Sequence, residues 1–150
     1  MPDMRDNYPS LSRALLEKFV PSFAPGSVLC GETGSDLISY GISGLAVNAD
    51  DMPDVVLYDA AHNRLLLVDF ATHRGLIDEI RVRTLAQLFQ TVKPQKVYVT
   101  VFQNRSSMAE YQKFPAWGTH AWFFDEPEHM IHFGGPFDRV VCGADKASLN

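Results

Sequence analysis

Residues 52–75 are the part of the sequence that most constrains the fold. They read MPDVVLYDAAHNRLLLVDFATHRG, which is two apolar runs separated by a short polar segment. This pattern predicts a β-hairpin with strands at 55–58 and 64–70 and a turn at 59–63. The second run is almost continuous in Leu and Val, which is typical of a strand buried on both faces.

An aspartate lies at the open end of each predicted strand. Asp54 follows Pro53 just before the first strand, and Asp69 falls near the end of the second. Side chains alternate along a strand, so Asp69 interrupts the apolar face formed by Leu65 and Leu67. A carboxylate there loses part of its hydration and needs a cation or hydrogen-bond donors. Two such acids can hold a divalent metal, although Asp54 could instead cap a turn and Asp69 could accept from backbone amides.

The remaining periodicity predicts an α/β fold with a mixed central β-sheet flanked by helices. Helices are expected at 10–21, 78–92 and 106–114, and further strands at 28–30, 96–102, 119–125 and 130–133. The helix signals are Ser10, Asp78 and Ser106 or Ser107 as N-caps, and Pro21 as a stop. The strand–helix–strand order from 64 to 101 fits a crossover between parallel strands, whereas the hairpin is antiparallel.

Length and composition limit the possible architectures. The 150 residues, 46% of them apolar, suffice for one domain over 1–150, with flexible tails expected at 1–9 and 143–150. No apolar run approaches the roughly 20 residues that span a bilayer, and the first residues lack the order of a secretory signal. We therefore expect a soluble, cytoplasmic protein without membrane contact. Cys30 and Cys142 are too few for a disulfide framework.

The overall charge is unfavourable for nucleic-acid binding. Thirteen basic and 18 acidic residues give a net charge of -5, whereas proteins that hold DNA by its phosphates usually have a basic surface. A net acidic charge still permits a local basic patch. One segment is locally basic, and it contains Arg74, Arg81, Arg83, Lys93, Lys96 and Arg105.

Several segments resemble the catalytic domain of one nuclease family. They are the 52–75 stretch, KVYVTVFQNR, FAPGSVLCGETG, the aromatic run AWFFDEPEHMIHF and, as the most specific, EPEHMIHFGG. Over residues 19–135 the chain resembles the BsuBI/PstI family of type II restriction endonucleases, within the PD-(D/E)xK nuclease superfamily. The resemblance implies a restriction-endonuclease-like fold and hydrolysis of DNA phosphodiester bonds with Mg²⁺ or Mn²⁺. It also implies a homodimer that recognises a six-base palindrome in double-stranded DNA.

The resemblance assigns metal-binding roles to acidic residues. Asp54 would be the first metal-binding acid, and Asp69 the second, at a position that the family more often fills with Glu. Glu32, in a glycine loop, is a candidate third metal ligand, with a solvated turn residue as the alternative. His129 and His132 are not expected to share a metal, because residues three apart in a strand face opposite ways.

The basic residue of the superfamily motif is missing from its usual place. The lysine belongs two residues after the second acid, where this chain has Ala71, and a methyl group cannot polarise water. His73, Arg74 and Arg81 are candidates to replace it. Arg81 is the strongest, because an arginine on the following helix resembles a family feature. An arginine stays protonated, so it would stabilise phosphate charge rather than act as a base.

Further residues are candidates for DNA contact. The expected DNA-binding set is Arg74, Arg81, Arg83, Lys96 and Arg105. Trp117, Trp122, Phe123 and Phe124 could stack on bases, but aromatic residues in a strand more often form core. The family's endonucleases carry an additional N-terminal region associated with sequence recognition, and little precedes Ser10 here, so a separate chain is a candidate to supply that region.

Two functions remain open at this point. The first is a divalent-metal-dependent endonuclease of the type II restriction type. The second is a catalytically impaired module of the same fold that binds DNA or a protein partner. Ala71 and the acidic net charge favour the second.

Overall fold

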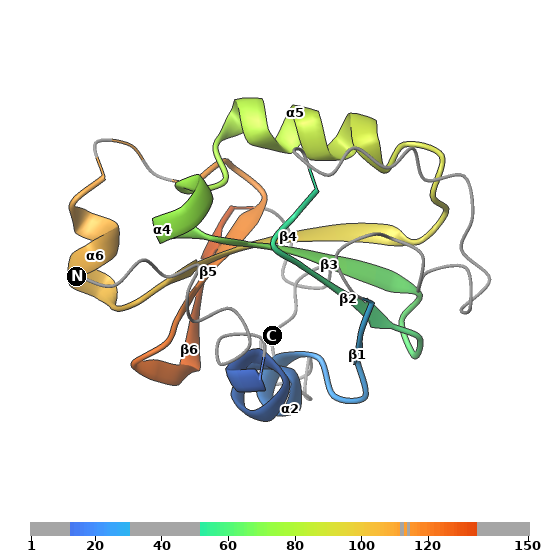
Figure 1. Ribbon diagram of the computed structural model, residues 1–150, viewed down its shortest axis with the longest axis horizontal. Coiled ribbons are helices and arrows are strands. Elements are labelled where there is room, and N and C mark those ends of the chain that lie inside the picture. The colour runs from blue at the N-terminus through green and yellow to red at the C-terminus, as the bar shows by residue number, and fades with distance from the viewer. Residues whose placement is uncertain (1–12, 31–51, 112, 114, 135–150) are drawn as a thin grey trace.

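Strand β3 (Arg64–Phe70) lies inside the sheet, and all 7 of its residues are buried. The computed structural model describes residues 13–30, 52–111, 113 and 115–134. Within these residues, the strands form a 6-stranded sheet in the order β1-β2-β3-β4-β5-β6 (Figure 1). Each strand therefore lies beside the strand that precedes it in the chain.

The sheet is mixed, as predicted. The other strands are β1 (Val28–Leu29), β2 (Val55–Asp59), β4 (Gln95–Phe102), β5 (Thr119–Phe123) and β6 (Glu126–Phe133). β2 and β3 form the predicted antiparallel hairpin. β3 pairs with β4, and β4 with β5, in parallel, whereas β1 and β6 run antiparallel to their neighbours. The predicted fold class, hairpin and parallel crossover are confirmed.

Helical segments lie on both faces of the sheet (Figure 1). The π-helical segment η2 (Leu15–Phe19) and the helix α2 (Val20–Phe23) pack on one face. Helix α5 (Glu79–Leu88) packs on the other and connects β3 to β4. Two short helices follow the parallel strands: α4 (Ala71–Arg74) comes directly after β3, and α6 (Arg105–Ala109) follows β4 after two intervening residues.

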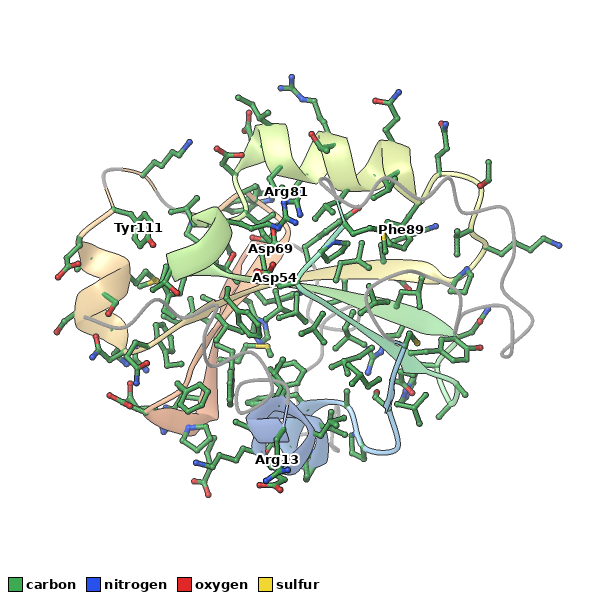
Figure 2. The ribbon with its side chains drawn as sticks, viewed as in Figure 1. Arg13, Asp54, Asp69, Arg81, Phe89 and Tyr111 are labelled. Carbon is green, nitrogen blue, oxygen red and sulfur yellow. The ribbon has the colours of Figure 1, made fainter. Side chains whose placement is uncertain are left out.

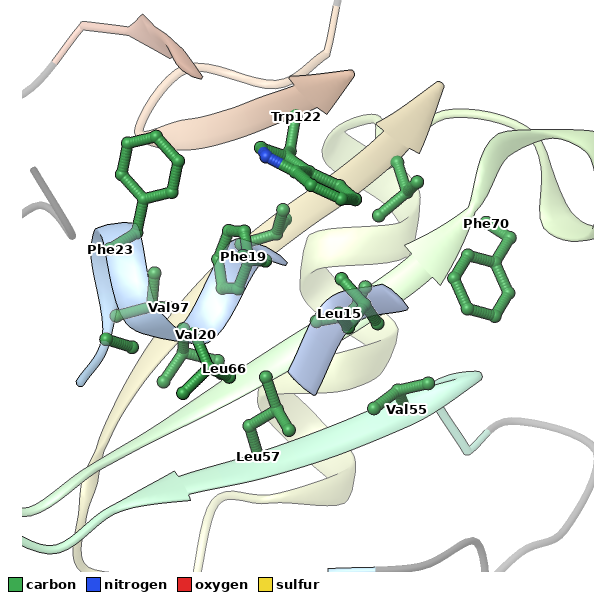
Figure 3. Close-up of a cluster of buried hydrophobic side chains, with 14 residues drawn as sticks. Leu15, Phe19, Val20, Phe23, Val55, Leu57, Leu66, Phe70, Val97 and Trp122 are labelled. Atoms are coloured by element: carbon green, nitrogen blue, oxygen red, sulfur yellow. The ribbon is translucent and has the colours of Figure 1, made fainter. Parts of the chain in front are cut away.

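The alternation along β3 divides the core into two layers. On the η2 side, β3 contributes Leu66, Val68 and Phe70 to a cluster that includes Phe19 and Trp122 (Figure 3). On the α5 side, the cluster includes Leu65, Leu67, Leu85 and Phe89. Asp69 has the same parity as Leu65 and Leu67, so its side chain belongs to the α5 side, as the sequence predicts.

The predicted helix ends were wrong in four places, one of which is the end of α6, at Ala109 rather than at residue 114. Pro21 does not stop the first helix, because it lies in the first turn of α2, where a missing N–H costs nothing, and the helix continues to Phe23. Helix α5 ends at Leu88 rather than at residue 92. Beyond it, Gln90 N and Val92 N each donate to the carbonyl three residues earlier, as in a tight turn. Helix α6 is capped by Asn104, whose Oδ1 accepts from Ser107 N at 2.8 Å, and not by a serine.

The other predictions, on strand and helix positions and on buried residues, are confirmed only in part. β6 begins at Glu126, four residues before the predicted start, and helix α4 was not predicted. Trp122 and Phe123 are core residues, whereas Trp117 is 80% exposed. Cys30 is buried, and Cys142, Ser10 and both predicted tails lie outside the described residues. Among the helices described, none has the length and apolar character needed to cross a bilayer.

Candidate metal site

The hairpin brings Asp54 and Asp69 together at one end of the sheet (Figure 2). Val55 pairs with Val68, so the residues one step further out are opposite each other. Asp54 N donates to Asp69 Oδ1 at 3.4 Å, and Phe70 N donates to Asp54 Oδ2 at 2.8 Å. The two carboxylates are therefore anchored to each other's strand through the backbone.

Both carboxylates are buried. The side chain of Asp54 is 1% exposed and that of Asp69 is 0% exposed. Ionised carboxylates at this depth need opposite charge and hydrogen-bond donors. Two arginines supply both.

Arg81 binds Asp69 with a two-point contact. Its Nε lies 2.6 Å from Oδ2, and its Nη2 lies 3.2 Å from Oδ1. Nη2 also donates to Met52 O at 3.3 Å. In Figure 2, Arg81 extends from α5 towards the two aspartates. This geometry is the bidentate pairing that makes Arg–carboxylate bonds strong and directional.

The first turn of α5 fixes the backbone of Arg81. Asp78, the N-cap predicted from the sequence, accepts from Arg81 N at 2.8 Å. Lys113 Nζ lies 2.5 Å from Asp78 Oδ2, and this hydrogen bond lowers the pKa of the Asp78 carboxyl. Asp78 therefore stays ionised, and an ionised cap suits the positive end of a helix dipole.

Arg74 contacts the other acid. It is the last residue of α4, and its Nε lies 3.3 Å from Asp54 Oδ1. Gly75 ends the helix with φ 76° and ψ -176°, a conformation that only glycine adopts readily. The chain can therefore reverse towards α5 while Arg74 stays beside Asp54.

Ala71 is enclosed by apolar side chains. It is 4% exposed and belongs to a cluster with Leu76, Phe102, Ala121 and Phe123. The Tyr111 hydroxyl donates to Ala71 O at 3.0 Å, and burial raises the pKa of Tyr111, so this donor stays protonated. A charged side chain at position 71 would need this cluster to rearrange.

The remaining predicted DNA-binding residues do not gather at the acids. Arg83 is exposed on α5, 3.9 Å from Glu79. Lys96 pairs in register with Leu65, four residues before Asp69, and its Nζ donates to Val92 O. Burial lowers the pKa of Lys96. Arg105 lies 2.7 Å from Glu126 and over the ring of Phe123.

The donor set fits a hard divalent cation in its chemistry. Asp54 and Asp69 present carboxylate oxygens from adjacent strand ends, and Mg²⁺ usually takes one or two carboxylates and completes its shell with water. Glu32, the third predicted ligand, lies outside the described residues. The described part of the chain contains no cluster of three or more His, Cys, Asp or Glu residues suited to a metal.

Sequence reasoning missed one buried polar pair. His120 on β5 and His132 on β6 are opposite each other, with 2.7 Å between their Nδ1 atoms, so one ring donates to the other. Burial, reinforced by His132 and Arg64, lowers the pKa of His120 from 6.5 to about 3. Burial also lowers the pKa of His132. The pairing depends on the register between β5 and β6, which shifts between Trp122 and Phe123. No sequence pattern predicts this register, so the histidine pair could not be predicted.

Comparison of the sequence with known proteins finds relatives of this chain. The BsuBI/PstI restriction endonuclease domain family matches residues 7–136. The type II restriction enzyme BsuBI of Bacillus subtilis is 38% identical over 133 residues, which cover 83% of this chain and 42% of BsuBI. The type II restriction enzyme AplI of Arthrospira platensis is 33% identical over 88 residues, covering 59% of this chain and 27% of AplI.

A solved structure agrees with these sequence matches. The SdaI restriction endonuclease superposes with a TM-score of 0.73 at 33% identity, over 88% of this chain and 46% of SdaI. The chain therefore spans less than half the length of each of these three proteins. The fold that was predicted from the resemblance is the fold of this relative. The chain belongs to the BsuBI/PstI restriction endonuclease domain family.

Proposed function

We propose that this chain is a divalent-metal-dependent DNA endonuclease of the type II restriction type, which hydrolyses phosphodiester bonds in double-stranded DNA. One observation carries the proposal: Asp54 and Asp69, two buried carboxylates, meet at adjacent strand ends in a member of a restriction endonuclease family. Family membership supports DNA as the substrate. The pair of acids supports a dependence on Mg²⁺, with Mn²⁺ as a substitute.

Asp54 and Asp69 would hold the cation through their carboxylate oxygens. A bound Mg²⁺ supplies positive charge for the scissile phosphate and lowers the pKa of a water molecule. The burial of both side chains supports this role, because a low local dielectric strengthens the attraction between a carboxylate and a cation. Glu32 is retained as a third candidate ligand on the resemblance alone.

Arg81 and Arg74 would carry the charge stabilisation that a lysine supplies elsewhere in the superfamily. Each guanidinium lies within hydrogen-bond reach of one acid, so each stands beside the expected position of the phosphate. A guanidinium can donate two parallel hydrogen bonds to a phosphate and remains charged at working pH. Neither arginine would act as a proton acceptor.

Sequence recognition is proposed to require two copies of the chain. A palindromic site mirrors the two-fold symmetry of a homodimer, so each copy would read one half of the six bases. Arg83, Lys96 and Arg105 would contact the DNA backbone away from the acids. A region corresponding to the rest of the relatives' length, supplied by a separate chain, remains a proposed partner.

A second candidate is a module that binds DNA or a protein without cleaving. Two observations favour it: Ala71 is sealed in an apolar cluster, and both acids are already paired with arginines. A protein of this kind would keep the fold and lose the chemistry. The two candidates differ in whether phosphodiester bonds break.

Plasmid cleavage distinguishes these candidates. Supercoiled plasmid is incubated with the protein and Mg²⁺ or Mn²⁺, using wild type, Asp54→Asn and Asp69→Asn. Wild type is expected to nick or linearise the plasmid, and each variant to lose about 100-fold or more in rate. Glu79→Gln is the matched control, because it removes one exposed carboxylate and the same charge.

Two outcomes of the plasmid assay would contradict the proposal. Cleavage by wild type that survives both Asn substitutions would overturn the assigned site. No cleavage with either metal, together with retention of a labelled duplex in a gel, would establish the binding module instead.

A further inference from the structure

Arg81 occupies the oxygens of Asp69 that a metal ion would use. Oδ2 accepts from Arg81 Nε at 2.6 Å, and Oδ1 accepts from both Arg81 Nη2 at 3.2 Å and Asp54 N at 3.4 Å. An ionised carboxylate offers about four acceptor positions, so these donors already take most of them. A cation that binds Asp69 through the same oxygens competes with the guanidinium.

The Nε contact of Arg74 with Asp54 is longer than that of Arg81 with Asp69. Arg74 Nε lies 3.3 Å from Oδ1, and the side chain is 22% exposed, against 14% for Arg81. Arg81 has a third point of attachment at Met52 O, 3.3 Å away. The Nε contact of Arg81 with Asp69, at 2.6 Å, is shorter than the 3.3 Å Nε contact of Arg74 with Asp54.

We propose that Arg81 is an internal counter-ion of the site, which divalent metal displaces from Asp69. This inference rests on the proposed metal site, and it assigns to Arg81 the control of metal affinity in addition to any contact with phosphate. Displacement costs the protein a partly buried, two-point ion pair, so the metal binds more weakly than two buried carboxylates alone would allow. The displaced guanidinium is then available to an anion.

A coupling between metal and DNA follows. A DNA phosphate that binds the Arg81 guanidinium would withdraw it from Asp69 and raise the affinity for metal. Linkage requires the reverse as well, so metal would raise the affinity for DNA by the same factor. Without metal, each of the two adjacent buried carboxylates is paired with a guanidinium of the same chain.

Calorimetric titration with Mn²⁺, in the absence of DNA, tests the proposal. Wild type, Arg81→Gln and Arg83→Gln are compared, since both substitutions remove one positive charge from α5 but only Arg81 contacts Asp69. Arg81→Gln is expected to bind Mn²⁺ about tenfold more tightly than wild type, a change equivalent to about 1.4 kcal/mol. Arg83→Gln is expected to bind as wild type does.

Each result bears on a different claim. If Arg81→Gln binds Mn²⁺ no more tightly than wild type, and Asp69→Asn abolishes binding, the metal site stands and the counter-ion role is overturned. If no variant binds Mn²⁺, the proposed metal site itself fails. Thermal unfolding checks that Arg81→Gln is folded. If Arg81→Gln does not fold, Arg81→Lys replaces it in the titration. Arg81→Lys keeps the charge but not the two-point contact, and it is expected to bind Mn²⁺ with an affinity between those of wild type and Arg81→Gln.

A spectroscopic readout observes the displacement directly. In the wild-type protein, the Arg81 Nε–H resonance should move towards that of an exposed arginine as Mg²⁺ is added, because its bond to Asp69 Oδ2 is lost. An Nε–H resonance that stays unchanged while Mg²⁺ saturates the site would overturn the proposal.

Discussion

Arg81, on α5, and Asp69, at the end of β3, form a partly buried two-point ion pair that joins helix to sheet. Each of the two residues is also positioned by its own secondary-structure element. Asp69 is placed by the alternation of β3, and Arg81 by the Asp78 cap three residues earlier. The same pair is the feature on which both the proposed chemistry and the proposed metal affinity depend.

The Asp69–Arg81 pair should contribute measurably to stability. Removing one partner leaves an uncompensated buried charge, so Asp69→Ala is expected to lower the free energy of unfolding by about 3 kcal/mol. The double variant Asp69→Ala/Arg81→Met should be less destabilised than the sum of the single variants, with a coupling of about 1–3 kcal/mol in urea unfolding. The exposed Glu79–Arg83 pair is the control, and it should show no measurable coupling.

The stability of the domain should fall with decreasing pH because of His120. The pKa of His120 is about 3 in the folded protein and 6.5 in the unfolded chain, so the unfolded chain binds the extra proton between these values. The free energy of unfolding is highest above pH 6.5, where His120 is neutral in both states. It decreases as pH falls towards 3, by about 1.4 kcal/mol per pH unit for one proton. Urea unfolding between pH 7 and 4 measures this slope.

One variant separates His120 from the other titrating groups. His120→Gln should flatten the slope by up to one proton. An unchanged slope in His120→Gln would mean that other groups set the acid sensitivity.

The cap of α6 gives a prediction that distinguishes two neighbouring residues. Asn104→Ala removes the bonds from Ser107 N and Oγ, at 2.8 and 3.0 Å, and should destabilise the protein by about 1 kcal/mol. Ser106→Ala, at the exposed position predicted as a cap, should have no effect. Thermal unfolding of both variants measures the difference, and equal destabilisation would contradict the assignment of the cap.

The sequence predicts the hairpin and its acids well, because the signals are local. Alternation along β3 places Asp69 on the α5 side, and the antiparallel turn places Asp54 opposite Asp69. The bond from Arg81 to Asp69 required the α5 crossover as well. Periodicity and the Asp78 cap indicated that helix, but the choice of Arg81 over Arg74 came from the family resemblance.

Other features depend on contacts that a linear pattern does not contain. Helix α4 has four residues and no periodicity to detect. Arg83, Lys96 and Arg105 are close in sequence, but they lie on three different elements: on α5, near the start of β4 and at the start of α6. The burial of Ala71 likewise follows from the packing of α6 and β5 and could not be predicted from the motif.

The most direct test of the central claim is metal-dependent cleavage that requires Asp69. The protein is stripped with EDTA, Mg²⁺ is restored, and linearisation of a supercoiled plasmid is followed for wild type and Asp69→Asn. We predict that wild type is inactive after EDTA, regains cleavage with Mg²⁺, and exceeds Asp69→Asn by about 100-fold or more. Cleavage that persists in EDTA, or an Asp69→Asn variant as active as wild type, would contradict the account.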